Sequence, residues 1–347
     1  MRAVRAGAEA TERPRRQPPK SAVNLVNLIE RFGSEDKCHA YLESLRWADG
    51  VACPRCQSGK ISRISSLVER AARHPGEAPR KEPRRQFDCD SCRYQFSVRV
   101  GTVFHDSHLP LWKWFLATYM MVESKKGMSA NQLKRTLDVS YKTAWYLCHR
   151  IRSAMDVADP QLLTGKVEVD ETYVGGKHKN RPASKRVKGY KGGGKSNKTM
   201  VLGAIARGGQ VRFHVERRNA SEVVLQAFIS EHVDDESAEV YTDQHPGYHK
   251  LSEHGFRHEM VDHSADEWVR ADVHTNTVES VWSILKRSII GSFHQLSAKH
   301  LEAYLDEIAF KFNNRFNPHL FRDTLMAMLD AETLTYAELT QTNSFPS

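Results

Sequence analysis

The sequence contains no apolar run of the roughly 20 residues that a membrane-spanning helix requires. Its first 20 residues hold five arginines and no apolar core segment, which is not the pattern of a secretory signal. We therefore expect a disordered basic arm at residues 1–22 of a cytoplasmic protein that has no membrane partner. Cysteine is scarce, with six residues in 347, and in a reducing compartment paired cysteines indicate a metal site rather than a disulfide.

Positive charge is in modest excess. Lys and Arg number 51 against 42 acids, a net charge of +9, which has the sign expected for a polyanion partner but also fits a basic protein without one. Residues 175–198 hold nine Lys or Arg, six Gly and no acid. This segment is either a solvated linker or a loop that follows a phosphate backbone, and the absence of acids favours the loop. Its candidate DNA contacts are Lys177, Lys179 and Arg181.

Apolar spacing predicts a multidomain α+β protein. Helices are expected within residues 21–50, with a start at Ser34, and across residues 108–157 and 276–332. A strand is expected at residues 95–100, and a helix at Val223–Ile229 lies among further strands. Those further strands are expected at residues 166–174, 199–206, 210–216, 238–242 and 257–262.

Four of the cysteines form two CxxC pairs, Cys53 with Cys56 and Cys89 with Cys92. Each pair turns two thiolates toward one point, so two pairs complete a tetrahedral Cys₄ site for a structural Zn²⁺. The gap between the pairs, 32 residues, exceeds the roughly 15–20 that are usual in such sites. The charged segment 65–86 is the evident insertion, which can loop out at small entropic cost.

Residues 129–155 predict two helices joined by a tight turn. Ser129 caps a short helix that ends at Leu137, and the second helix runs over residues 141–155. A second helix with a charged outer face suits a DNA groove or the phosphates beside it, although two packed helices with a charged exterior are also common. The candidate DNA contacts on this outer face are Lys142, Thr143, Arg150 and Arg152.

Three carboxylates lie on three separate expected elements. Asp170 is in an alternating segment, Asp243 follows a short strand, and Glu279 is near the start of a long helix, seven residues before Lys286. Hard divalent cations need carboxylate oxygens from separate rigid elements, and a two-metal site stabilises both oxygens of an in-line phosphoryl displacement. Taken alone, an Asp at a strand end is usually a turn or cap residue, and a Glu early in a helix usually answers the helix dipole. Their joint placement indicates a Mg²⁺ (or Mn²⁺) site.

A wider set of motifs carries a family resemblance. They are Leu45–Trp47, Gly50, Gly101–Phe104, Leu109–Trp112, Ser124–Ser129, Lys142–Trp145, His149–Arg152, Val169–Gly176, Tyr241–Asp243, His274–Asn276, Glu279, Lys286, Tyr304, Glu307 and Asn313–Arg315. With these motifs, over roughly residues 25–320, the sequence resembles the DDE insertion-sequence transposases that carry an N-terminal zinc ribbon (the "IS fifteen-ninety-five", ISXO-like family).

The resemblance implies an RNase H-like catalytic domain in which Asp170, Asp243 and Glu279 hold the metal ions and Lys286 assists. Members of the family differ in whether the third ligand is an acid or an asparagine. Asn276 is therefore the alternative to Glu279, which we prefer because a charged oxygen binds magnesium better. Glu168 and Glu171 are left out of the ligand set.

The implied activity is metal-dependent cleavage of an insertion sequence's ends followed by strand transfer, in a bacterial, nucleoid-associated enzyme. Its partner is double-stranded DNA, and two ends imply a homo-oligomer. The alternatives are a zinc-ribbon and helix-turn-helix regulator without catalysis, and an RNase H-like nuclease that joins nothing. The expected domains are a ribbon at 23–100, a DNA-binding region at 101–160, a catalytic domain at 161–320 and a helical tail at 321–347.

Overall fold

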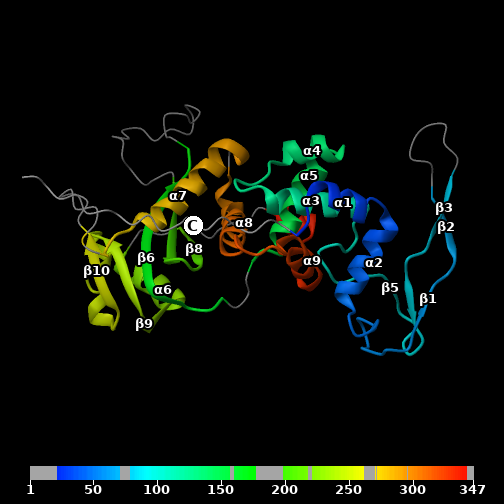
Figure 1. Ribbon diagram of the computed structural model, residues 1–347, viewed down its shortest axis with the longest axis horizontal. Coiled ribbons are helices and arrows are strands. Elements are labelled where there is room, and N and C mark those ends of the chain that lie inside the picture. Colours follow the sequence, from blue (N-terminus) through cyan, green and yellow to red (C-terminus); the bar gives the residue numbers. More distant parts are fainter. Residues whose placement is uncertain are drawn as a thin grey trace, which may run out of the picture.

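The computed structural model describes residues 22–70, 79–156, 160–176, 198–217, 221–261, 270, 272–294 and 296–341. Figure 1 shows a row of three parts: a β-sheet region with helices on its faces, a central group of helices, and a small ribbon region at the opposite end. Among the described helices none is long and apolar enough to cross a membrane. Lys177, Lys179 and Arg181 lie outside the described residues.

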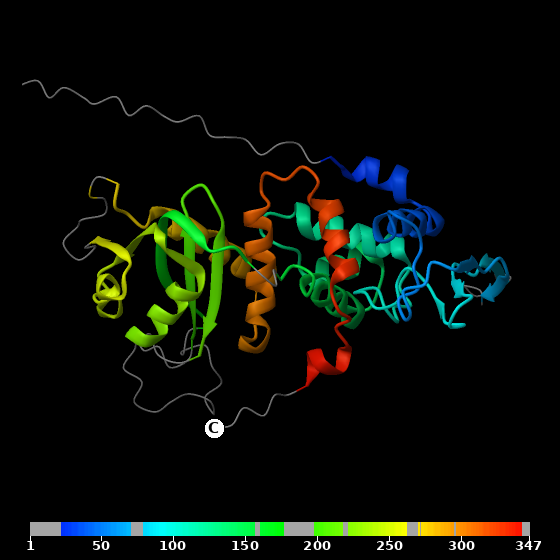
Figure 2. The same cartoon turned by 90° about the horizontal axis from the view of Figure 1, so that it is seen from below.

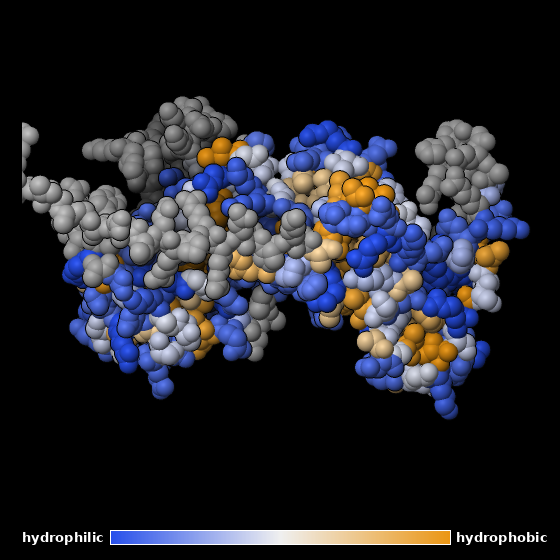
Figure 3. Space-filling view, viewed as in Figure 1, coloured by the Kyte–Doolittle hydropathy of each residue, from blue (hydrophilic) through white to orange (hydrophobic). Residues whose placement is uncertain are grey.

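The central group buries one large apolar cluster that includes Phe32, Leu42, Phe115, Leu133 and Met328. Its helices are α1 (Leu25–Phe32), α2 (Glu35–Arg46), α3 (Leu111–Glu123), α4 (Ala130–Leu137), α5 (Tyr141–Arg152) and α9 (Leu320–Asp330). On its outside, α1 leaves Leu25, Val26 and Ile29 exposed, and an apolar patch lies over this helix in Figure 3.

Serine caps set the starts of three of these helices. The hydroxyls of Ser34, Ser129 and Ser140 accept hydrogen bonds from backbone N–H groups three residues later, which satisfies one of the open donors of each first turn. The expected start at Ser34 and the expected cap at Ser129 are therefore confirmed. At its other end α4 stops at Asp138, whose left-handed φ of 49° turns the chain into α5.

The ribbon region contains two small sheets. Strands β1 (Ile61–Arg63), β4 (Phe87–Cys89) and β5 (Gln95–Phe96) form one antiparallel sheet. Strands β2 (Leu67–Arg70) and β3 (Arg80–Pro83) pair antiparallel within the charged insertion and form the arm at the edge of Figure 1. The expected strand at 95–100 is correct only for its first two residues, because residues 98–100 turn back instead of continuing.

A five-stranded sheet, in the order β10-β9-β6-β7-β8, forms the other end of the molecule. Its strands are β6 (Leu163–Val174), β7 (Thr199–Ala206), β8 (Val211–Glu216), β9 (Val233–Asp243) and β10 (Arg257–Val261). β6, β7 and β8 run antiparallel, whereas β9 and β10 run parallel to β6. The five strands expected from apolar spacing are all present, and the sheet brings the first and fourth of them into contact.

Helices cover both faces of this sheet. One face packs against α6 (Glu222–His232) and two short 3₁₀ helices, η3 (Pro246–Tyr248) and η4 (Leu251–His254), around Val167, Val169 and Val240. The other face packs against α7 (Asn276–Ser288) and α8 (Leu301–Asn313) around Val201 and Ile205. A π-helical turn, Ile289–Phe293, and a 3₁₀ turn, Ala298–His300, connect α7 to α8.

Helix α8 also connects the sheet region to the central helices. It contacts β8 on one side and α5 on the other, and Figure 2 shows it standing between the two regions. At the contact Glu307 of α8, which is fully buried, pairs with Arg152 of α5 at 2.7 Å and with Lys311 at 2.6 Å. The chain then returns through α9 into the central cluster and ends its described part near α10 (Tyr336–Thr340). The domain boundaries stay predictions, but α9 is not a separate tail.

Candidate active site and metal centre

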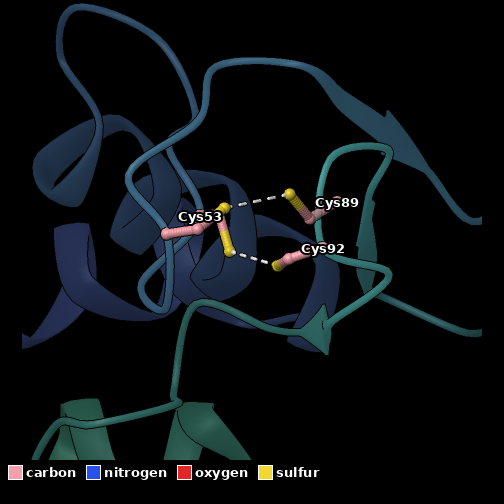
Figure 4. Close-up of side chains that lie close together, drawn as sticks. Cys53, Cys89 and Cys92 are labelled. Carbon is pink, nitrogen blue, oxygen red and sulfur yellow. Dashed lines mark hydrogen bonds between the residues drawn. The ribbon is translucent and has the colours of Figure 1, made fainter.

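Two loops bring the four paired cysteines together. Figure 4 shows Cys53, Cys89 and Cys92 turned toward one another, and the sulfur atoms of all four cysteines lie within 4.8 Å of each other. The two closest cross-pair distances are 3.7 Å and 3.5 Å. Zinc–sulfur bonds of about 2.3 Å in a tetrahedron place sulfur atoms about 3.8 Å apart. The cluster therefore fits Zn²⁺ with four protein ligands and no position left for water.

The backbone explains why the two pairs have the same shape. The N–H of the residue after each pair, Gln57 or Arg93, donates to the carbonyl of the first cysteine of that pair. Both residues take a left-handed φ, 60° and 59° respectively, which tightens the turn under the sulfur atoms. Below the cluster, Trp47, Phe87 and Phe96 form a small aromatic core of their own.

The first two candidate metal ligands lie on neighbouring parallel strands. The register pairs Glu168 of β6 with Tyr241 of β9. Asp170 stands two residues beyond Glu168, and Asp243 stands two residues beyond Tyr241, so continuing the same register places the two aspartates side by side. Asp243 ends β9, whereas β6 continues to Val174. Parallel neighbours are about 4.8 Å apart in the backbone, close enough for two carboxylates to share a cation.

Helix α7 contacts the first of these aspartates directly. The Trp282 indole N–H donates to Asp170 Oδ2 at 2.8 Å. The indole reaches this position because Gly203, which pairs with Asp170 across β6 and β7, has no side chain: a Cβ there would lie 2.4 Å from the Trp282 ring. Gly203 and Trp282 therefore act together to orient the Asp170 carboxylate.

The site raises the proton affinity of Asp170. Its pKa increases from an ordinary 3.8 to about 7, chiefly because burial removes the carboxylate from water. The nearby charges of Glu171 and Asp243 raise the pKa as well, and the hydrogen bond from Trp282 opposes them. A bound cation would stabilise the ionised carboxylate strongly here, because its charge would offset both the burial and the repulsion from the neighbouring acids.

Glu168 connects the sheet to the start of α7. It is fully buried and points to the same side of β6 as Asp170. Its carboxylate accepts from the backbone N–H groups of Thr277 and Val278 in the first turn of α7 and forms an ion pair with Arg207 at 2.6 Å. A negative charge at a helix start is favourable, so Glu168 fixes where α7 begins relative to the sheet. The alternation of β6 already places Glu168 on the same side of the strand as Asp170, but sequence reasoning did not use this to give Glu168 a role.

Glu171 lies on the opposite side of β6, as the alternation predicts. Its carboxylate accepts from the Tyr248 hydroxyl at 3.0 Å, and Tyr248 belongs to the apolar cluster under α6. The charge of Glu171 still acts on Asp170 through the strand. Glu171 thus contributes to the raised pKa of Asp170, although its side chain lies on the other side of the strand.

The third candidate ligand is exposed. Glu279, its alternative Asn276, and Lys286 all lie on the solvent side of α7. Among the described residues only the four cysteines satisfy the spacing of a metal cluster, so Asp170, Asp243 and Glu279 are not gathered as tightly as the cysteines. Glu279 follows the buried Val278 and precedes Trp282 by three residues, so it stands at the edge of the helix face that contacts Asp170.

Two of the candidate DNA contacts on α5 are not where sequence reasoning placed them. Arg150 and Arg152 are 4% and 2% exposed, so their expected place on the outer face is wrong. Arg150 donates to the His105 carbonyl at 2.6 Å, and Arg152 pairs with Glu307. Both guanidinium groups thus serve packing within the chain. Lys142 is exposed and lies over the Tyr336 ring, and Thr143 is half-buried near Ser140.

Comparison with known proteins agrees with this arrangement. Residues 162–313, which hold the five-stranded sheet with α7 and α8, match the family model described as the ISXO2-like transposase domain. Residues 33–95 match the transposase zinc-ribbon domain. The chain is 32% identical over 266 residues to an uncharacterized protein in transposable element ISH50 of Halobacterium salinarum, a match that spans 75% of this chain and 84% of the relative. The chain therefore belongs to the zinc-ribbon transposases of the ISXO2-like family.

Proposed function

We propose that this protein binds the ends of an insertion sequence and catalyses metal-dependent DNA cleavage and strand transfer. One observation carries the proposal: Asp170 within β6 and Asp243 at the end of β9 lie on neighbouring parallel strands, Trp282 of the helix that carries Glu279 donates to Asp170, and the pKa of Asp170 is raised to about 7. The mixed five-stranded sheet with helices on both faces supports an RNase H-like domain for this chemistry.

In this proposal Asp170, Asp243 and Glu279 hold two Mg²⁺ or Mn²⁺ ions. When bound, such ions activate a water or a 3′-hydroxyl and stabilise the charge of the displaced oxygen. Trp282 orients one carboxylate, and Glu168 places the helix that brings the third. Lys286 is two turns along α7 from Glu279, where it can hold a DNA phosphate.

DNA binding is assigned to the helix pair α4–α5 and to the basic loop. The two helices have the lengths and the tight turn of a helix-turn-helix, with Lys142 and Thr143 at the start of the second helix. Lys177, Lys179 and Arg181 supply phosphate contacts from the loop between β6 and β7. Two element ends must meet, so the active form is a homo-oligomer.

The test is cleavage and joining of a labelled DNA that carries the element's flanking repeats, with magnesium. Wild type is compared with Asp243→Ala and Glu279→Gln, and Asp235→Ala is the matched control because it removes an exposed acid from the same strand. We expect joined product only from the wild type and the control. Asn276→Ala decides between the two third-ligand candidates.

Each other outcome selects a different function. Tight DNA binding without any cleavage would favour a regulator built on the same ribbon and helices. Cleavage without joining would favour a nuclease. Equal cleavage by wild type and Asp243→Ala would show that the assignment of the metal ligands is wrong.

A further inference from the structure

A cavity of about 330 Å³ lies where the central helices meet the sheet region. Its walls come from the start of α4, from α5, from the turn after α7 and from α8. The size is at the lower end of the range for small-molecule sites. Its lining includes none of Asp170, Asp243 and Glu279, and the cavity residue Phe293 follows Glu279 by 14 positions, which is about 20 Å along a helix.

Aromatic rings form much of the lining. Trp145, Tyr304 and Phe293 reach the cavity from three different elements, and Tyr141 stands at its rim with 50% of its surface exposed. Neighbouring rings hold two of these in place. Trp145 packs edge-on against His149 at 4.6 Å between ring centres, and Tyr304 packs against Phe293 at the same distance. The rings are therefore fixed before any ligand enters.

Two arginines line the cavity, and only Arg135 is free of an ion pair with a described acid, because the charge of Arg152 is balanced by Glu307. Arg152 lies beneath it, stacked 4.0 Å over the Tyr304 ring, and Arg135 of α4 is exposed at its edge. None of the described lining residues is an Asp or a Glu. The exposed cation of Arg135 beside the exposed Tyr141, with no acid in the lining, is a combination that binds a base by stacking and its phosphate by charge.

We infer that this cavity binds one unpaired nucleotide of a DNA strand. The base lies against Tyr141 and Trp145, and Arg135 contacts its phosphate. A base in a duplex is already stacked on both faces, so only an unpaired or displaced base can use such a platform. The cavity lies between the helix pair proposed to bind DNA and the end of α7, so an unpaired nucleotide at an element end is the matching ligand.

This inference rests on the DNA-binding part of the proposed function, and the test separates the two. A blunt labelled duplex is compared with the same duplex that carries a short single-stranded extension containing 2-aminopurine, in buffer without added magnesium so that no strand is cut. We expect the wild type to bind the extended duplex about tenfold more tightly and to quench the 2-aminopurine, since stacking one base on an aromatic ring has an effect of that order.

The variants are chosen at exposed positions so that the fold is kept. Tyr141→Ala and Arg135→Ala should lose the preference and the quenching while they still bind the blunt duplex. Lys134→Ala is the control, because it removes an equal charge from an exposed neighbour of Arg135 that does not line the cavity. Equal binding of both duplexes by the wild type would overturn the inference alone. Binding of neither would overturn both it and the DNA-binding proposal.

Discussion

At the scale of single residues, Asp170, a proposed metal ligand, shows how a carboxylate placed to hold a cation opposes the stability of the folded protein. The chain buries this carboxylate, faces it with the charges of Glu171 and Asp243, and orients it with Trp282. Without a cation the folded state resists the loss of the Asp170 proton. This burial of Asp170 is explained if the ionised carboxylate is needed only when a cation is bound to it.

This predicts a stability curve with a definite sign. Because the folded pKa of Asp170, about 7, lies above its ordinary 3.8, the folded state keeps the proton longer, and stability falls as pH rises between these values. Asp170→Asn removes the titration and keeps an acceptor for Trp282. At pH 8 without magnesium we expect the variant to have a higher melting temperature than wild type. The corresponding gain in unfolding free energy is on the order of 4 kcal/mol.

Calorimetry at two pH values checks this prediction. The difference should shrink at pH 4, and magnesium at pH 8 should stabilise the wild type but not Asp170→Asn. Asp138→Asn serves as the control, since it changes an exposed acid in a left-handed position that an amide also tolerates. A variant that melts below the wild type at pH 8 would contradict the proposed strain at Asp170.

Sequence reasoning found residues whose partners are near in the chain. The hydroxyls of Ser34 and Ser129 cap helices through atoms three residues away, so local pattern was sufficient. It misplaced Arg152 because the partner of that residue, Glu307, follows it by 155 positions. It placed Trp282 on the buried face of its helix but did not foresee the contact with Gly203, since that contact depends on how α7 crosses β7, and no local period encodes the crossing.

At the scale of elements, the fully buried Glu168 carboxylate fixes the start of α7 to the sheet. Glu168 accepts from the first turn of the helix and pairs with the Arg207 side chain. Glu168→Gln would leave Arg207 without its counter-charge and would place an amide N–H₂ against backbone donors. We expect a loss of about 3–5 kcal/mol in unfolding free energy, measured in urea.

Glu279→Gln is the matched comparison on the same helix. Glu279 is exposed, so the same chemical change there should alter stability by less than about 0.5 kcal/mol while it abolishes cleavage. Comparison of the two variants therefore distinguishes a residue that positions α7 from one proposed to bind the metal. If Glu168→Gln were as stable as wild type, α7 would have to be positioned by its apolar face alone.

The zinc ribbon should behave as a folding unit of its own. Its aromatic core is small, so the metal supplies much of its stability. We expect one zinc per chain by colorimetric assay, and we expect chelation to change the fluorescence of Trp47 while the five-stranded sheet stays folded. Cys92→Ser should lower the zinc content, whereas Cys38→Ser, outside the cluster, should leave it at one. Full zinc content in Cys92→Ser would argue against a four-cysteine site.

At the scale of the whole molecule, the buried triad of Arg152, Glu307 and Lys311 connects the central helices to the sheet region. Glu307 has no exposed surface, and its pKa is held below the usual value by the two cations despite burial, which alone would raise it. Lys311 also donates to the Ser124 carbonyl at 3.0 Å, so the triad reaches the segment that precedes α4. The two regions are thereby coupled through charges that are almost wholly buried.

Arg152→Met should therefore weaken the coupling as well as the fold. Removing one member of a buried ion pair leaves an uncompensated charge, and we expect a loss of about 3–5 kcal/mol, reduced to the extent that Lys311 compensates. Arg322→Met, which breaks an exposed pair with Asp323, should cost less than about 1 kcal/mol. Urea unfolding monitored by both far-UV dichroism and tryptophan fluorescence distinguishes the two effects. Coincident transitions in wild type and separate ones in Arg152→Met would show that the triad makes the two regions unfold together, whereas coincident transitions in both proteins would place the coupling in the apolar contacts of α8 instead.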